Sequence, residues 1–231
     1  MTRALARAVA AARPGMDVRV SFLDHAGPRP GEVLFAFSAL GHRSAVVVPL
    51  LLTAAYHGRI DLPAVLDAAR DAGLRLDVSV TDVLGPVDGV VHPLLLAGLR
   101  RRLLAAVGGP FDGVVLAAAG TRDDRARSTV DLAARELGDA LGVPCRAAFG
   151  SGSPVTGAVA VTALRDAGCE RIAVAAYFLA CGQLYDSVTR SALSAGALAP
   201  AAQPLANAFD LARLVIDRVN AVADFDFVRA A

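Results

Sequence analysis

The stretch SAVVVPLLLTAAYHGRID, residues 44–61, joins an apolar run to a polar segment that contains His57. Residues 45–52 are apolar on both faces and rich in Val and Leu, which predicts a strand of a parallel sheet with helices on each side. Asp61 and Pro63 then predict a helix start. We therefore expect His57 in a loop beyond the carboxyl end of a strand, where open α/β sheets bind ligands.

Strands and helices alternate outward from this stretch. On the amino-terminal side, helix, strand and helix are predicted at residues 2–13, 17–24 and 28–40. On the carboxyl-terminal side, helix, strand and helix are predicted at residues 62–72, 76–83 and 90–107, up to a break at Gly108-Gly109-Pro110. Beyond the break, strands are predicted at 113–119, 143–149, 171–179 and, more weakly, 197–204, with helices at 124–141, 154–167, 185–194 and 208–222.

The two parts of the chain resemble each other. Residues 39–48 parallel residues 165–174, because in each a helix ends near a glycine and a charged link leads to an apolar strand. Alternating strands and helices require parallel pairing. We expect an α/β fold of two tandem flavodoxin-like halves, residues 1–108 and 109–231, each a parallel sheet between helices.

Composition narrows the class of protein. A net charge of +1 argues against a nucleic-acid partner, and no apolar run approaches the roughly 20 residues that span a bilayer. The opening residues are rich in arginine and free of acids, but they end in Pro-Gly as a first helix does, which favours a helix over a transit peptide. Cys145, Cys169 and Cys181 form no Cys-x-x-Cys pair and predict core residues of a reduced, cytoplasmic protein.

Residues 44–61 resemble the motif of the class II chelatases, of the small cobalt-chelatase and sirohydrochlorin-chelatase type. In that motif an apolar strand leads into Phe/Leu-Leu-x-x-Gly-x-His-Val-x-x-Asp-Ile-Pro. The matching positions are Leu51, Leu52, His57, Asp61, Leu62 and Pro63; the departures are Ala55 and Gly58. The resemblance implies a chelatase that inserts Fe²⁺ or Co²⁺, with Ni²⁺ as a further candidate metal, into an acidic tetrapyrrole for siroheme or cobalamin biosynthesis, without an organic cofactor.

The same resemblance implies that parts of the family's site are missing. The family's first strand ends in His-Gly-Ser/Thr-Arg-Asp, whose His helps to hold the metal. In the second half this His is Ala119, ahead of Gly120 and Thr121, and a later family His falls on Gln183 or Leu184. In the first half the strand itself is absent from the sequence. We therefore expect impaired insertion; the alternative is a non-catalytic tetrapyrrole- or metal-binding module.

His57 is the candidate catalytic residue and metal ligand, because neutral imidazole binds borderline metals and accepts protons near neutral pH. His25, at the same predicted edge, is the second candidate ligand or a solvated loop residue. His42 and His92 are predicted bystanders. The candidate substrate-binding residues are Tyr56, Arg59, Arg122, Ser151 and Ser153.

Two of these assignments have alternatives. Arg59 is either a partner of a substrate carboxylate or an ordinary surface arginine. The segment Phe149-Gly150-Ser151-Gly152-Ser153-Pro154 resembles an anion cradle at a helix start, yet a flexible turn with a serine N-cap fits it better than a nucleotide site does.

The missing strand sets two further expectations. We predict four parallel strands in the second half and three in the first. Because the absent strand is central in the family, we also predict that residues 18–23 pair directly with residues 46–52. We expect the loops around His57 and Gly120 to face one cleft.

Overall fold

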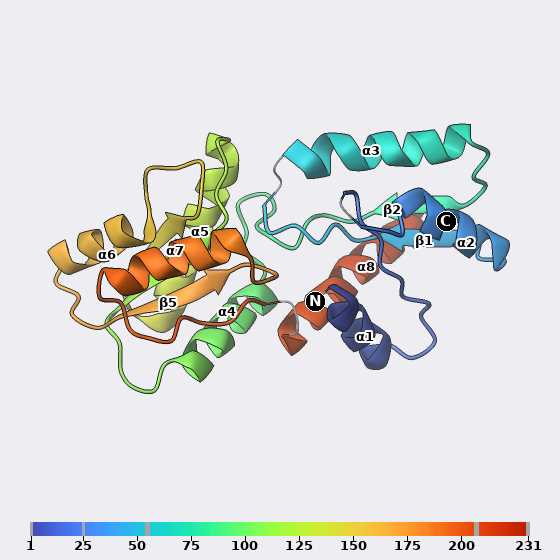
Figure 1. Cartoon of the computed structure of the whole chain (residues 1–231). Coiled ribbons are helices and arrows are strands. Elements are labelled where there is room, and N and C mark those ends of the chain that lie inside the picture. Colours follow the sequence, from blue (N-terminus) through green and yellow to red (C-terminus); the bar gives the residue numbers. More distant parts are fainter. Residues whose placement is uncertain (1, 25, 54–55, 206–207, 230–231) are drawn as a thin grey trace.

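The computed structural model describes residues 2–24, 26–53, 56–205 and 208–229, with side chains outside residues 54–61 and 223–231. The chain forms two lobes, each a small parallel sheet with helices on both faces (Figure 1). The α/β class and the two-part organisation are confirmed. Among the described residues, no helix is long and apolar enough to cross a membrane.

The second lobe holds a three-stranded parallel sheet in the order β4-β3-β5. Its strands are β3 (Gly113–Ala118), β4 (Cys145–Phe149) and β5 (Ile172–Tyr177). The middle strand β3 pairs along its whole length with β5, and every residue of both strands is buried. Such burial follows from sequences that are apolar on both faces, since helices cover both sides of the sheet.

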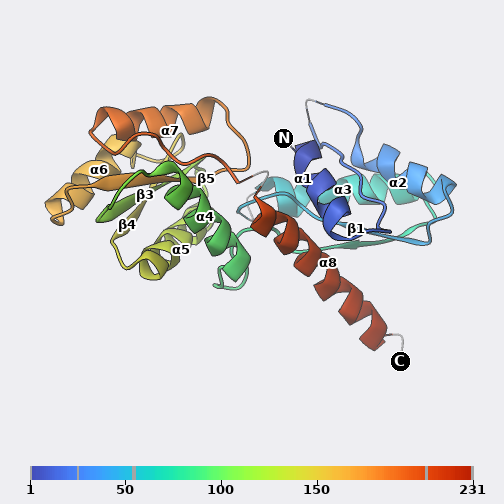
Figure 2. The same ribbon diagram turned by 90° about the horizontal axis from the view of Figure 1, so that it is seen from below.

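Four helices cover this sheet. α4 (Pro93–Ala106) and α5 (Asp124–Leu141) pack on one face, and α6 (Gly157–Asp166) and α7 (Gln183–Ser194) on the other (Figure 2). α5 begins where the Asp123 carboxylate accepts hydrogen bonds from the first-turn amides, and it ends at Gly142 in the left-handed conformation.

The predicted fourth strand of this lobe is wrong. Residues 198–205 run beside β5, where Leu198 N donates to Ile172 O at 2.7 Å and Ala202 N donates to Val174 O at 2.8 Å, but they form no regular strand. Pro200 interrupts the segment, and proline has no N–H to donate to a ladder.

The first lobe has a two-stranded parallel sheet of β1 (Ser44–Val47) and β2 (Asp77–Val80). No residue of β1 is fully buried, in contrast to β3 and β5. β1 is shorter than predicted because Pro49 lacks an N–H, and Leu51 N instead donates to Pro49 O in a turn. α2 (Pro30–Ala39) and α3 (Tyr56–Asp71) pack together on one side of the sheet.

The strand predicted at residues 17–24 is wrong, and so is its direct pairing with residues 46–52. Residues 17–22 are extended, but among the described residues no backbone hydrogen bond reaches residues 18–21. Alternating apolar residues make a strand only when a neighbouring strand accepts and donates the backbone bonds. Here that neighbour is missing.

α3 begins earlier than predicted. Its first turn contains Tyr56, His57 and Arg59, and Pro63 lies inside the helix rather than at its start. The expectation that His57 lies in a loop is therefore wrong. Residues 56–61 contain no proline and only Gly58 as a weak helix former, so the helix extends amino-terminal to the predicted cap.

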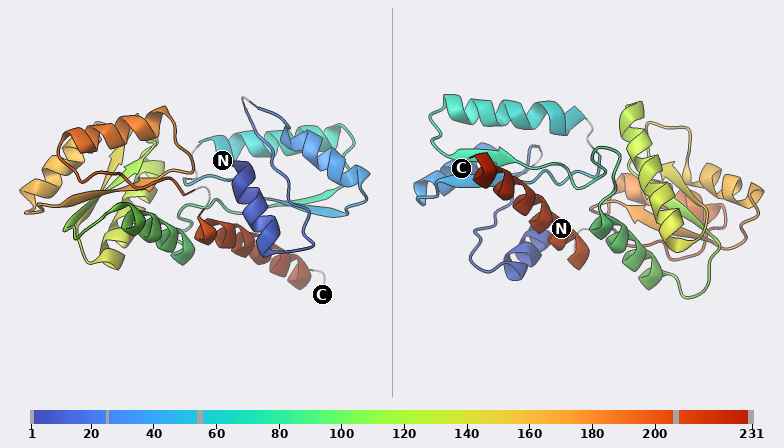
Figure 3. Two further views of the ribbon diagram at one scale, coloured as in Figure 1. Left: turned by 60° about the horizontal axis from the view of Figure 1, so that its bottom comes forward. Right: turned by 180° about the vertical axis from the view of Figure 1, so that it is seen from behind.

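The last helix of each part of the sequence packs in the other part. α4 follows β2 in the chain but packs on β5 and α5, whereas α8 (Phe209–Arg229) packs against α1 (Thr2–Ala12) (Figure 3). α4 and α8 also contact each other, and Arg101 of α4 pairs with the buried carboxylate of Asp210 at 3.0 Å. One hydrophobic cluster therefore runs through both lobes, from Leu5 to Val215, and a second, smaller cluster lies between α2, α3 and the sheet of the first lobe.

The three cysteines are free. Cys169 is buried as predicted and Cys145 is partly buried, but Cys181 is exposed, so its prediction as a core residue is wrong. Cys181 follows the carboxyl end of β5, where the chain runs over the surface before α7.

Candidate functional site

A cleft opens between the lobes at the carboxyl ends of strands from both sheets. Its cavity measures about 240 Å³. The lining residues continue β1, β3 and β5: they are 50–53, 118–121 and 177–179, together with Val130. The carboxyl end of a parallel strand exposes backbone and loop groups that a ligand can reach, so this is the edge where a site is expected.

Tyr177, the last residue of β5, joins the lobes inside this cleft. Its hydroxyl donates to the carbonyl of Leu52 at 2.8 Å, and only 3% of the residue is exposed. Burial raises the pKa of the Tyr177 phenol, so it stays protonated and keeps donating. The bond holds the segment that leads into α3 against the second sheet.

The loop after β3 packs closely against the loop after β4. Gly120 has a φ of +92°, and a Cβ there would lie 2.0 Å from the carbonyl oxygen of Ser151. Only glycine fits both the conformation and the space. Arg127 of α5 donates to the carbonyls of Thr121 and Gly152 at 3.0 and 3.1 Å, which fixes the two loops to each other.

Ser151 and Ser153 use their hydroxyls within this loop. Ser151 Oγ donates to Ala119 O at 3.2 Å, and Ser153 Oγ accepts from Val155 N at 3.2 Å. α6 starts three residues after Pro154, and its N-cap is Thr156, whose side chain accepts from Val159 N. Neither serine therefore caps the helix, so the serine N-cap of the alternative prediction, a flexible turn, is wrong. Ser151 lies next to the cleft lining and remains a candidate contact.

The other predicted contacts divide between the two sides of the cleft. Arg122 follows the lining residue Thr121 and is exposed. Tyr56, His57 and Arg59 belong to the first turn of α3, shortly after the lining segment 50–53, but their side chains lie outside the described part of the structure. His25 also lies outside the described residues.

Two histidines have structural roles away from the cleft. His42 packs edge-on against Phe37, with ring centroids 5.0 Å apart, and approaches the Asp17 carboxylate at 3.4 Å. His92 caps α4, because its Nδ1 accepts from Leu94 N at 3.3 Å. That both are bystanders of the site stays a prediction.

The described side chains build no complete metal site: among them, no three His, Cys, Asp or Glu residues gather closely enough to hold an ion. Ala119, where the sequence motif placed a histidine, lines the cleft. Sequence reasoning missed Tyr177 and Arg127. An aromatic hydroxyl at the end of the otherwise apolar run Ile172–Tyr177 was a usable signal for the first, whereas nothing distinguished Arg127 from the other arginines.

Comparisons with known proteins agree with this architecture. The structure is similar to SirB from Bacillus subtilis with Fe³⁺, at 20% identity and a TM-score of 0.79, covering 94% of this chain and 86% of that one. It is also similar to the sirohydrochlorin chelatase SirB from Bacillus subtilis subspecies spizizenii in complex with cobalt, at 19% identity and a TM-score of 0.73, covering 96% and 88%. No curated protein matches the chain.

The family comparison covers both lobes. The CbiX family matches residues 1–105 and again residues 113–222, which together account for most of the chain. The resemblance to class II chelatases is thereby confirmed, and the chain belongs to the CbiX family.

Proposed function

We propose that this protein is a chelatase of the sirohydrochlorin type, which inserts Fe²⁺ or Co²⁺ into an acidic tetrapyrrole in the cleft between the lobes. One observation carries the proposal: the carboxyl ends of β1, β3 and β5 open into a single cleft at the start of the segment that bears His57. The solved SirB structures, with Fe³⁺ and with cobalt, support the choice of metals as substrates.

The cleft would hold one edge of the macrocycle. Its 240 Å³ is below the roughly 300–1,000 Å³ of pockets that enclose a drug-sized ligand, so the rest of the ring would lie outside. The lining is largely apolar, from Leu50, Leu51 and Phe178, which suits the face of a conjugated ring. Arg59 and Arg122 are the proposed partners of the substrate's carboxylates.

In this mechanism His57 has two tasks. Its neutral imidazole receives the metal. Once the metal has passed to the ring, the freed imidazole nitrogen accepts one of the two pyrrole protons that the metal displaces, and the other proton passes to water. Tyr177 acts as a positioning residue, because its bond to Leu52 fixes the approach to α3. With a single imidazole the metal would bind weakly, so we infer that this chain is a slow chelatase.

The test is anaerobic insertion of Fe²⁺ or Co²⁺ into sirohydrochlorin, followed by the change in its absorbance. We expect slow insertion by the unaltered chain and none by His57→Ala. His42→Ala is the matched control, since His42 lies before β1 and its ring interacts with Phe37 and Asp17. Insertion that is equal in His57→Ala and in the unaltered chain would contradict the assignment.

A second candidate function is a tetrapyrrole-binding module without turnover. Ala119 favours it, because a methyl group occupies the cleft position of the motif's histidine. In that case the unaltered chain would shift the absorbance of metal-free sirohydrochlorin. Adding Fe²⁺ or Co²⁺ would then change the spectrum no faster with the protein than without it.

A further inference from the structure

Arg127 lies in the first turn of α5, and its guanidinium contacts both of the loops that follow β3 and β4. Its Nη1 donates to the carbonyl of Thr121, in the loop after β3, at 3.0 Å, and to the carbonyl of Gly152, in the loop after β4, at 3.1 Å. Its Nη2 pairs with the carboxylate of Asp124. Because Asp124 is 87% exposed, water weakens that ion pair, and the two loop carbonyls are the main partners.

The two loops interlock closely, but few backbone bonds join them. Gly152 has a φ of +65°, and a Cβ there would lie 2.9 Å from the carbonyl carbon of Thr121. Near the strands, Ser151 N donates to Ala119 O at 3.1 Å. Beyond Ser151, in the described part of the chain, no backbone hydrogen bond crosses from one loop to the other. The bonds that join the outer parts of the loops therefore come from Arg127.

These loops form the second lobe's side of the cleft. Gly120 and Thr121 line the cavity, and Arg122 and Ser151, the candidate contacts of the tetrapyrrole, are their neighbours in the two loops. Arg127 itself is not among the lining residues. Its effect on a bound ligand therefore has to pass through the loops that it holds.

The chemistry of arginine suits this task better than that of lysine. A guanidinium is planar and carries five N–H donors in a fixed fork, so it can serve two carbonyls and a carboxylate at once. Hydrogen bonds from a charged donor are also stronger than those between neutral groups. The ammonium group of lysine is a compact charge on a flexible stem, and it would not hold both carbonyls in one geometry.

We propose that Arg127 is a positioning residue for tetrapyrrole binding: it holds the loop after β3 against the loop after β4, so that Arg122 and Ser151 keep a fixed separation at the cleft. The inference rests on the proposed function, since the ligand is the acidic tetrapyrrole named there. The candidate metal ligand His57 belongs to α3 in the other lobe. Loss of Arg127 therefore weakens binding of the tetrapyrrole and leaves binding of the metal unchanged.

The first measurement needs no substrate. It compares hydrogen exchange of the loop amides of Asp123 and Ser151, which donate to Thr121 Oγ1 and to Ala119 O, in Arg127→Ala and in the unaltered chain. We expect exchange about tenfold faster in the variant, the factor that corresponds to about 1.4 kcal/mol of local stability. Arg135→Ala is the matched control, because Arg135 is an exposed arginine further along α5, and it should leave the rates unchanged.

The second measurement separates the two substrates. Titration of metal-free sirohydrochlorin, followed by absorbance, gives its Kd, and the dependence of anaerobic insertion on Co²⁺ gives the KM for the metal. For Arg127→Ala we expect the Kd for sirohydrochlorin to rise about tenfold and the KM for Co²⁺ to stay the same. Added guanidinium ion, at concentrations well below those that unfold the protein, should restore part of the affinity in Arg127→Ala but not change that of Arg135→Ala.

Arg127→Lys keeps the charge and most of the stem, so it serves if the alanine variant does not fold. We expect it to bind sirohydrochlorin almost as weakly as Arg127→Ala, because it lacks the fork. Affinity equal to that of the unaltered chain in Arg127→Lys, or in a folded Arg127→Ala, would overturn the inference. A higher Kd without faster loop exchange would also overturn it, since Arg127 would then touch the tetrapyrrole directly.

Failure of this inference is distinguishable from failure of the proposed function. If the unaltered chain binds sirohydrochlorin and the Arg127 variants bind it equally well, only the role of Arg127 is overturned. If the unaltered chain neither binds sirohydrochlorin nor inserts a metal, the proposed function is contradicted and the positioning role is overturned with it.

Discussion

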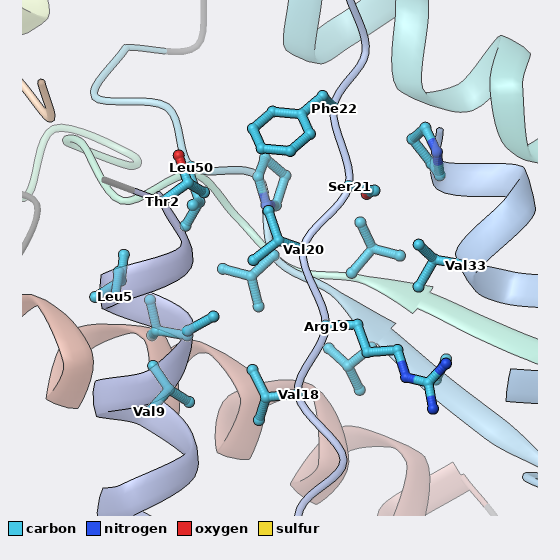
Figure 4. A pocket seen from close by; sticks show the side chains of 18 of the residues that line it. Thr2, Leu5, Val9, Val18, Arg19, Val20, Ser21, Phe22, Val33 and Leu50 are labelled. Carbon is cyan, nitrogen blue, oxygen red and sulfur yellow. The ribbon is translucent and has the colours of Figure 1, made fainter. Parts of the chain in front are cut away.

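The two sheets differ in one strand, and that difference changes the burial and the pairing of the neighbouring strands. In the second lobe β3 pairs on both sides, and all residues of β3 and β5 are buried. In the first lobe the corresponding place is a groove between residues 17–23 and residues 45–51 (Figure 4); among the described residues β1 pairs only with β2, and residues 17–22 join no ladder. Two similar sequences thus reach different packing because a parallel sheet depends on its middle strand for both neighbours.

The strongest way to sharpen this comparison is to give the first lobe a middle strand with a functional end. A copy of residues 112–123 grafted ahead of Thr2, with Ala119→His in the copied part, is designed to place an imidazole at the cleft. Because borderline metals gain affinity with each nitrogen ligand, we expect Fe²⁺ or Co²⁺ insertion to rise about tenfold or more over the graft that keeps alanine. The initial rate of the absorbance change measures it; equal rates would show that the strand end does not reach the metal.

Matched core substitutions test the difference in packing. Val174→Ala in β5 removes two methyl groups from a residue that is 1% exposed, and should lower the free energy of unfolding by about 2 kcal/mol. Val47→Ala in β1 removes the same groups from a partly buried residue, and should cost less than about 1 kcal/mol. Urea denaturation measures both. Equal losses would mean that the two sheets are equally well packed.

Tyr177→Phe tests the link between the lobes. It removes the hydroxyl that donates to Leu52 O and leaves the ring in place, so we expect a loss of about 1 kcal/mol. Faster exchange of amides in residues 50–53, but not in β3, would show that the bond holds this segment. Tyr185→Phe is the control, because it removes a hydroxyl of the same kind that bonds to Ala202 within the second lobe.

The smallest effect concerns the contact between α4 and α8. Burial lowers the pKa of His92 from 6.5, Arg218 lowers it further, and Asp217 opposes the shift. The folded protein therefore resists protonation of His92: its stability is unaffected above pH 6.5 and falls as the pH drops from 6.5 through the lower folded pKa.

His92→Asn keeps an N-cap acceptor but does not titrate in this range. As the pH drops from 7.5 to 5.5, we expect the melting temperature of the variant to fall less than that of the unaltered chain. The difference between the two falls should be a few degrees at most, since 1 kcal/mol corresponds to about 2–4 °C at this size. An identical pH dependence of the melting temperature in the two proteins would show that protonation of His92 does not affect stability.

Elements with a two-sided apolar pattern could be predicted from the sequence, and those that depend on a neighbour could not. β3 and β5 lie where predicted because runs such as Ile172–Tyr177 can only be buried. Residues 17–24 carry an equally clear pattern, yet in the described part of the chain no strand pairs with them. The packing of α4 and α8 each in the other lobe could not be predicted either, since an apolar helix face does not specify which sheet it will cover.

The candidate site was predictable in outline only. A family motif predicted the edge of the sheet where the cleft lies, because spacing between a strand and a polar segment survives in sequence, whereas the role of His57 stays a prediction. The bond from Tyr177 to Leu52 joins residues far apart in the chain, and no local pattern encodes such a pair. The predicted start of α3 was too late in the chain, because Pro63 can follow the first turn of a helix as well as stand in it.

The exchanged helices also determine the order in which the protein can be completed during synthesis. α4 leaves the ribosome before β3, so the second sheet finds its covering helix already made. The first sheet must wait for α8, the last helix, whose Leu211 and Val215 share a core with Leu5 and Val9 of α1. The part of the chain that is made first is therefore finished last, and until then its apolar face is a natural target for chaperones.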